Sequence, residues 1–177
     1  MLTLHVADGS AEAVLVDGGL IAAMGSYEAL AAAHPAARVR RWPGVITAGR
    51  LNARAAELLE AAYHPDPREA AELGTEPLTG DALAALDMDE ARWGASARRG
   101  LQRMLKQGTT AVTGPFSRRT VRTAVARSGL RVREPGSGAE GPLRVGGPAD
   151  FAIFDGPLDG ATCVATVLGG RLVYRRT

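Results

Sequence analysis

The stretch of sequence that decides the fold is Trp42-Pro43-Gly44-Val45-Ile46-Thr47-Ala48-Gly49-Arg50-Leu51-Asn52-Ala53-Arg54-Ala55-Ala56-Glu57. Its first part is a short β-branched run, Val45 to Thr47, and such runs are typical of strands. After Gly49 and Asn52 the apolar residues recur with helical spacing, until the sequence His64-Pro65-Asp66-Pro67 ends the segment. The chain is therefore expected to change here from strand to helix.

The residues before this stretch predict mainly β-structure. Leu2 to Ala7 alternates apolar and polar residues, which is the period of a half-buried strand. The two short strands Ala13 to Val16 and Leu20 to Met24 flank Asp17-Gly18-Gly19, a tight-turn sequence, and so predict a hairpin. Tyr27 to Ala33 is expected to form a helix that His34-Pro35 ends, and Val39 to Trp42 to form another strand.

The residues after it alternate helix and strand. A capping-box spacing at Asp87 to Glu90 predicts a helix that continues to Gly108. Strand Thr109 to Thr113, helix Arg118 to Ser128 and strand Leu130 to Val132 follow, which predicts a βαβ unit with locally parallel pairing. Residues 68–80 form a polar excursion with at most one helical turn. A Gly/Pro-rich linker at 134–142 then precedes three strands, at residues 151–154, 163–168 and 172–174.

Three stretches in this order resemble the amidohydrolase superfamily, and imidazolonepropionases and aminodeoxyfutalosine deaminases in particular. Ala13 to Gly25 is similar to the opening hairpin of that family. Ala97 to Val112, with Leu105-Lys106-Gln107-Gly108-Thr109-Thr110, is similar to the helix and second strand of its barrel. Gly141 to Phe151 is similar to the segment that returns the chain to a small β-sandwich. The resemblance implies an α/β fold and hydrolysis or deamination at carbon–nitrogen bonds.

The same resemblance identifies where metal-binding histidines would stand. Aligned on Gly49 and Asn52-Ala53, the family's His-x-His motif falls on Arg54 and Ala56. Two histidines two apart on a strand point to the same side and can bind one metal. Arginine is protonated and has no lone pair to give, and alanine has no donor atom. The sequence therefore predicts no metal at these positions and no other cofactor.

The fold expected from these patterns is a small β-sandwich made from both chain termini, with a truncated β/α barrel fragment inserted. Residues 1–49 and 141–177 would form the sandwich, residues 50–134 the insert, and residues 135–140 the linker. Only about 85 residues lie between Arg50 and Glu134, whereas an eight-stranded barrel takes about 250 residues. The later barrel strands, which carry further metal ligands in the family, are expected to be missing.

Composition restricts the remaining possibilities. The chain has 177 residues, is 46% hydrophobic, and has a net charge of only +2. Its one cysteine, Cys163, allows no internal disulfide, which fits the cytoplasm, and no run is long and apolar enough to cross a membrane. Aromatic residues make up 5%, too few for base-stacking platforms, so nucleic acid is not expected as a partner.

The candidate site residues are few. The chain contains three histidines, His5, His34 and His64, and none has a ligand-like spacing. We consider His64 and Asp66 weak catalytic candidates, since Glu60 is also near in sequence, and a structural role for His64 is the alternative. Gly114-Pro115, between a strand and a helix, is a weak candidate for binding an anion. Two basic helix faces are either solvated or patches for an anion or an acidic partner: Arg98, Arg99 and Arg103, and Arg118, Arg119 and Arg122.

Three functions remain open at this stage. The first is a non-catalytic amidohydrolase-like protein that binds a small molecule or a protein partner. The second is a metal-dependent hydrolase or deaminase that acts on carbon–nitrogen bonds with an unorthodox or shared site. The third is a structural subunit that completes another protein. Because an open β/α fragment exposes strand edges and the apolar face of Val112, Leu130 and Val132, a homodimer or heteromer through the insert is expected.

Overall fold

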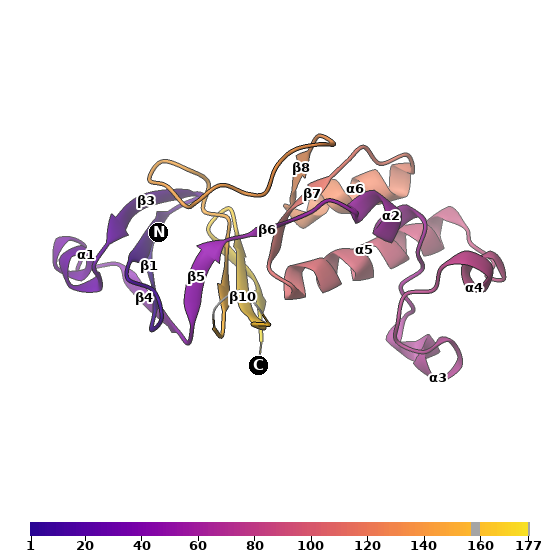
Figure 1. The fold of residues 1–177 in the computed structure, drawn as a ribbon, viewed down its shortest axis with the longest axis horizontal. Coiled ribbons are helices and arrows are strands. Elements are labelled where there is room, and N and C mark those ends of the chain that lie inside the picture. Colours follow the sequence, from indigo (N-terminus) through magenta and orange to yellow (C-terminus); the bar gives the residue numbers. More distant parts are fainter. Residues whose placement is uncertain (157–159, 177) are drawn as a thin grey trace. The chain divides into compact units, whose positions relative to one another are not determined.

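The computed structural model describes residues 1–156 and 160–176 and shows a mixed α/β chain with three small sheets (Figure 1). Two sheets have four strands, in the orders β3-β2-β1-β4 and β11-β10-β9-β5, and the third has three, in the order β6-β7-β8. None of these sheets closes into a barrel over the described residues. The α/β fold class is therefore confirmed. Within the same residues, no helix is long and apolar enough to cross a membrane.

The chain divides into two compact units. Unit 1 consists of Met1–Arg50, Leu105–Thr110 and Ala139–Thr177, and unit 2 consists of Leu51–Met104 and Ala111–Gly138. Both chain ends therefore contribute to unit 1, while unit 2 comes from the middle of the sequence.

The first sheet of unit 1 is formed by the N-terminal residues. Its strands are β1 (Leu2–Ala7), β2 (Ala13–Asp17), β3 (Leu20–Gly25) and β4 (Arg38–Trp42). β1 pairs antiparallel with β2 and parallel with β4, which leaves β4 at the edge. Helix α1 (Tyr27–Ala33) connects β3 to β4, begins at the capping Ser26 and ends at His34, as the His34-Pro35 sequence predicts.

The second sheet joins the two ends of the chain. It contains β5 (Val45–Ala48), β9 (Phe151–Phe154), β10 (Cys163–Leu168) and β11 (Arg171–Arg175). β5 pairs antiparallel with β9, with Val45 opposite Phe154. The turn from β4 to β5 depends on Gly44, because its φ is positive and an added Cβ would overlap the Phe154 carbonyl oxygen.

The two four-stranded sheets share an apolar core. One sheet supplies buried residues such as Val14, Ile21 and Trp42, and the other supplies Phe151, Ile153 and Val167. A second cluster around Leu4 and Leu15 lies on the opposite face of the first sheet, where Leu30 of α1 covers it. The alternation in β1 predicts a half-buried strand, but Thr3 and His5 are buried as well as Leu4, because both faces of the first sheet are covered.

Unit 2 is built around β7 and the helices beside it. Its elements are β6 (Arg50–Asn52), α2 (Ala55–Glu60), the 3-10 turn η1 (Pro67–Glu69), α3 (Ala70–Leu73), α4 (Gly80–Ala84), α5 (Glu90–Lys106), β7 (Thr109–Thr113), α6 (Arg119–Ser128) and β8 (Arg131–Arg133). β7 pairs parallel with β8, so the predicted βαβ unit is confirmed. The buried side chains of this unit include Leu59, Trp93, Leu101, Val112 and Val125.

Several boundaries differ from the sequence-based expectation. α5 begins at Glu90 rather than at Asp87, because Asp89 is the residue whose carboxylate accepts the Arg92 N–H, at 2.6 Å. The region 68–80 contains more helix than expected, in η1 and α3. Of the apolar face expected to be open, Val112 and Leu130 are buried and only Val132 is exposed, at 55%.

Candidate functional site

The residues that follow α2 form a cluster of polar side chains in unit 2. We call it the His64 cluster; its members are Tyr63, His64, Asp66, Glu69, Arg92 and Arg99. The backbone of Tyr63 pairs with that of Leu78 through two hydrogen bonds of 2.8 Å, which fixes the segment like a short strand. The His64 N–H donates to the Ser96 hydroxyl on α5, at 2.9 Å.

The imidazole of His64 is buried between α2 and α5. Its Nε2 lies 2.9 Å from the Leu58 carbonyl oxygen, which only accepts, so Nε2 carries the proton. Burial lowers the pKa of His64, and Arg103 and Arg99 lower it further, against the opposing effect of the Leu58 hydrogen bond. The other ring nitrogen, Nδ1, is buried without a hydrogen-bond partner among the described residues. Gly100 of α5 makes room for this ring, since a Cβ there would lie 2.6 Å from Nε2.

The two carboxylates of the cluster are held by neighbouring groups. Asp66 and Glu69 form a capping box at the start of η1. The Glu69 carboxylate accepts from the Tyr63 hydroxyl, from the Asp66 N–H at 2.9 Å and from Arg92 at 2.9 Å. The Tyr63 hydroxyl is the largest cause of the lowered pKa of Glu69.

Arg99 connects the remaining members. Its Nε donates to the His64 carbonyl oxygen at 2.7 Å, and its Nη1 lies 3.3 Å from an Asp66 carboxylate oxygen. The structure thus brings the two sequence-predicted candidates, His64 and Asp66, into one network. The side chains of this cluster form hydrogen bonds to other protein groups, with the exception of His64 Nδ1. The network therefore stabilises the loop between α2 and α5.

The two positions aligned with the family's metal ligands lie in a different setting from the one expected. β6 ends at Asn52, so Arg54 and Ala56 do not lie on a strand. Arg54 precedes α2 and forms an exposed ion pair with Glu57 at 2.7 Å, while Ala56 is in the helix. The predicted change from strand to helix after Asn52 therefore places Arg54 and Ala56 at the start of α2, where two positions two apart do not face one side as they would on a strand. Among the residues that the structure describes, no three His, Cys, Asp or Glu side chains could hold a metal ion.

The other candidate residues from the sequence are buried or hydrogen-bonded to protein groups. His5 is buried in unit 1, accepts a hydrogen bond from Trp42 Nε1 at 3.2 Å, and has its pKa lowered to about 4 by burial and by Arg40. The Gly114 N–H donates to the Arg133 carbonyl oxygen at 3.0 Å, so it is not free for an anion. Cys163 is buried, and burial raises the pKa of its thiol.

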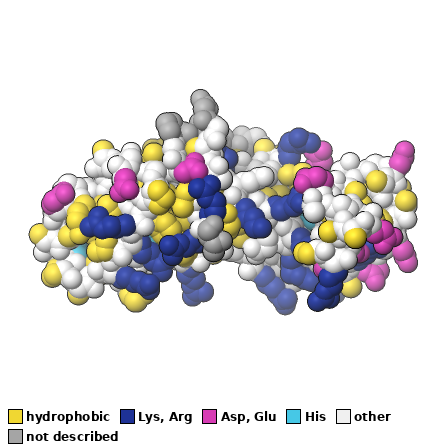
Figure 2. All heavy atoms as spheres, turned by 90° about the horizontal axis from the view of Figure 1, so that it is seen from below, with side chains coloured by type: hydrophobic (Ala, Val, Ile, Leu, Met, Phe, Trp, Pro, Cys, Tyr) yellow, Lys and Arg dark blue, Asp and Glu magenta, His cyan; other side chains and the backbone are white. Residues whose placement is uncertain are grey.

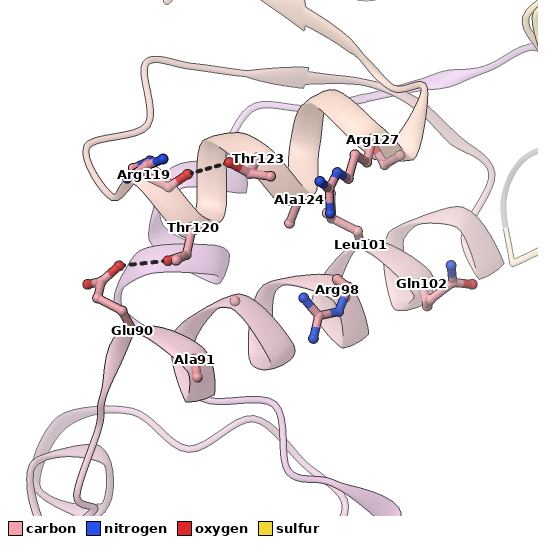
Figure 3. A pocket seen from close by; sticks show the side chains of 12 residues that line it. Glu90, Ala91, Arg98, Leu101, Gln102, Arg119, Thr120, Thr123, Ala124 and Arg127 are labelled. Carbon is pink, nitrogen blue, oxygen red and sulfur yellow. Dashed lines mark hydrogen bonds between the residues drawn. The ribbon is translucent and has the colours of Figure 1, made fainter.

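A groove lies between helices α5 and α6 of unit 2 (Figure 3). Its volume is about 660 Å³. Leu101 of α5 and Ala124 of α6 are buried residues in its lining and give it an apolar floor. Gln102, Thr120 and Thr123 add polar groups along its sides. The two helices approach closely at Gly94, where an added Cβ would lie 3.4 Å from Thr120 Cβ.

Three arginines line this groove: Arg98, Arg119 and Arg127. Arg98 projects from α5 and Arg127 from α6, and Figure 3 shows both side chains at the groove. None of the three guanidinium groups has an ion-pair or hydrogen-bond partner within the described part of the chain. The one carboxylate of the lining, Glu90, is already engaged by Arg118 at 3.2 Å and by the Thr120 hydroxyl at 2.9 Å. The groove therefore carries positive charge that the described residues leave uncompensated.

The arginines of the two predicted basic helix faces fall into two sets in the structure. Arg99, Arg103, Arg118 and Arg122 bind protein groups, whereas Arg98 and Arg119 are left at the groove. Arg127 and Gln102 were not among the predicted residues. The helical spacing of Arg119, Thr123 and Arg127 on α6 is the signal that could have found this face.

Comparisons with known proteins give one family match and two structural likenesses. The model of the imidazolonepropionase-like composite domain of bacteria matches residues 13–37. A comparison with curated proteins gave no significant match. The chain is similar to the ochratoxinase of A. niger, with 18% identity over 77% of this chain and a TM-score of 0.48. It is also similar to guanine deaminase from Bradyrhizobium japonicum, with 21% identity over 70% of this chain and a TM-score of 0.41.

The chain spans only part of these structures, 32% of the ochratoxinase and 27% of the guanine deaminase. The family match covers β2, β3 and α1 of unit 1, which include the hairpin quoted above. Residues 13–37 are therefore similar to the imidazolonepropionase-like composite domain, which confirms the resemblance that the opening hairpin predicts.

Proposed function

We propose that this chain is an amidohydrolase-like protein without metal-dependent catalysis, and that it acts by binding a small anionic molecule in the α5–α6 groove. In this proposal unit 1 corresponds to the composite β-sandwich domain, and unit 2 to a remnant of the β/α barrel. The single observation that carries the proposal is the groove of about 660 Å³ lined by Arg98, Arg119 and Arg127, whose guanidinium groups have no ion-pair partner among the described residues. The carboxylates of Asp66 and Glu69 already accept hydrogen bonds from protein groups, which speaks against a catalytic role for the His64 cluster.

The chemistry of the lining indicates the class of ligand. Guanidinium groups bind carboxylates and phosphates through charge-assisted hydrogen bonds, and a planar pair of donors fits two oxygens of one group. Arginine has no lone pair, so Arg98 and Arg127 cannot ligate a metal. The Thr123 hydroxyl and the Gln102 amide add neutral donors, and the Leu101 and Ala124 floor accepts an apolar body. A small carboxylate or phosphate ester with a short apolar part fits these features.

The test is titration of the protein with inorganic phosphate, succinate and a hydrophobic carboxylate such as phenylacetate, followed by calorimetry and by the thermal midpoint. We expect an anion to raise the midpoint and the double variant Arg98→Gln/Arg127→Gln to lose that response. Arg68→Gln is the matched control, because Arg68 is exposed in the same unit and lies outside the groove. Equal responses from the double variant and the control would contradict the proposal.

The enzymatic alternative makes an opposite prediction. A metal-dependent hydrolase acting on carbon–nitrogen bonds would need about three metal ligands and an open position for water. For the proposed function we expect elemental analysis of the purified protein to give far less than one Zn or Fe per chain. The enzyme would be established instead if the protein contained about one metal ion per chain, and if a chelator removed both that metal and the hydrolysis of an amide or amine substrate.

A partner bound through the insert is a second candidate role, and one observation favours it. β8 is one of the two edge strands of the β6-β7-β8 sheet, and its Val132 is 55% exposed. Exposed edges with apolar side chains invite pairing with another chain. A homodimer or a heteromer through β8 would cover this edge. Light scattering at micromolar concentration should then show a dimer that Val132→Lys disrupts, and a monomer at all concentrations would contradict self-association.

A further inference from the structure

We infer a second binding surface in unit 1, at the open edge of β4, which takes an acidic extended segment of a partner protein as an added strand. This inference is independent of the α5–α6 groove. It concerns a hollow of about 230 Å³ lined by Arg38, Val39, Arg40, Arg41, Trp42 and Arg175. Figure 2 shows Lys and Arg side chains spread over the visible face rather than gathered in one place, so the surface is defined by the residues that line this hollow.

The backbone of β4 has one free side. Among the residues that the structure describes, β4 pairs with β1 alone and is the last strand of its sheet. The Trp42 carbonyl oxygen accepts the Asp8 N–H at 3.2 Å, so the backbone groups of Trp42 point toward β1. Backbone groups alternate along a strand, and those of Val39 and Arg41 therefore point to the open edge. They offer the ladder that an incoming strand requires.

The charge at this edge selects the partner. The lining of the hollow contains four arginines and no acidic residue. None of these four has a carboxylate partner among the residues described. Arg38 and Arg175 both lower the pKa of the Arg40 guanidinium after the larger effect of burial, which shows that the positive charges crowd one another. A strand with glutamate or aspartate at alternate positions would place carboxylates beside these side chains.

The same charge disfavours other occupants. A second copy of β4 would bring arginines opposite arginines, and like charges in directly opposed positions are destabilising. Single-stranded nucleic acid needs aromatic faces for its bases, but Trp42 is buried and Tyr27 lies under the Arg41 guanidinium, 4.5 Å from ring centroid to Cζ. An acidic, extended polypeptide can both pair with the open backbone edge of β4 and place carboxylates beside its arginines.

The experiment uses fluorescence anisotropy with the full chain and a labelled peptide of alternating Glu and Thr, eight residues long. Two further peptides separate the two contributions: an alternating Gln and Thr peptide of equal length, and the Glu peptide with alternate backbone nitrogens methylated. We expect only the unmodified Glu peptide to bind, and its affinity to fall with added salt. Equal binding of the Gln peptide, or of the methylated peptide, would overturn the inference.

Variants tie the peptide to this edge. Arg38→Gln/Arg175→Gln should weaken peptide binding on the order of tenfold, as expected from the loss of two charge pairs. It should change the thermal midpoint little, because the loss of repulsion on Arg40 is opposed by the loss of the Arg175 guanidinium over the Trp42 ring, 5.6 Å from the ring centroid. Arg171→Gln, at the far end of β11, is the control and should bind the peptide like the unmodified chain. A single-stranded oligonucleotide that binds in place of the peptide, and loses binding in the double variant, would show a nucleic-acid surface and overturn the inference.

Discussion

The His64 cluster and the α5–α6 groove both use side chains of helix α5, yet they differ in how their polar groups are satisfied. In the cluster, Arg99 binds the His64 carbonyl oxygen and Asp66, and Glu69 accepts three hydrogen bonds. In the groove, Arg98 has no such partner among the described residues. Arg98 and Arg99 are neighbours in sequence but face different directions, because adjacent residues on a helix point about 100° apart. Two residues of the same type therefore differ in role here, because one has hydrogen-bond partners within the protein and the other does not.

The largest expected effect compares these two neighbouring arginines. Arg99→Gln should lower the free energy of unfolding by about 2 kcal/mol, because it leaves the His64 carbonyl oxygen and Asp66 without their charged donor. Arg98→Gln should change it by less than about 0.5 kcal/mol, as is usual for an exposed side chain. Chemical denaturation of both variants measures the difference. Equal losses would show that the groove arginine is structural too.

The next effect compares two glycines of α5. Gly100→Ala should destabilise the protein by about 1–2 kcal/mol, because a Cβ there would lie 2.6 Å from His64 Nε2 and 2.7 Å from Leu59 Cδ2. Gly94→Ala, at the groove, meets Thr120 at 3.4 Å, an ordinary contact. It should be neutral or stabilise the helix by up to about 1 kcal/mol. Thermal unfolding of the pair gives the sign of each change, and a stabilising Gly100→Ala would mean that the His64 ring is not tightly held.

The smallest effect is a dependence of the cluster on pH. The folded state lowers the pKa of His64 below its usual value of about 6.5, so the unfolded chain binds a proton first as the pH falls. The stabilising effect of the neutral ring is therefore complete above pH 6.5 and declines below it, toward the lowered pKa of the folded state. His64→Gln should flatten this part of the stability curve relative to the unmodified chain. His5, whose pKa is lowered to about 4, remains in both proteins and contributes equally to each.

The sequence predicted the elements with strong local patterns. The strands 2–7, 109–113, 151–154 and 163–168 and the helix 27–33 match the structure residue for residue, because alternation and capping are local signals. The cap at Asp89 and helix α4 were missed, and one helical turn was expected between residues 68 and 80, where the structure has both η1 and α3. Two acidic residues compete for the capping position at Asp87 to Glu90, and four-residue helices have too few apolar positions to show a period.

The sites were less predictable for a physical reason. His64 and Asp66 could be named from the sequence, but their partners Ser96 and Arg99 lie more than 30 residues away. Whether a histidine is free or engaged depends on such distant partners. The groove likewise exists only because two helices lie side by side. Arg127 of α6 becomes a candidate binding residue because Arg98 of α5 lines the same groove. Composition suggested that the arginines were surface charges and could not show which of them lack a counterion.

The pairing of β5 with β9 has a consequence for the order in which the chain folds. These strands are neighbours in the sheet but lie roughly 100 residues apart in sequence. Closing a long loop costs conformational entropy, and contacts of high sequence separation slow folding. The second sheet of unit 1 cannot be completed until the residues after 150 have been synthesised, whereas the β7-α6-β8 contacts are local. We therefore expect a nascent chain to gain protease resistance in unit 2 first and in unit 1 last.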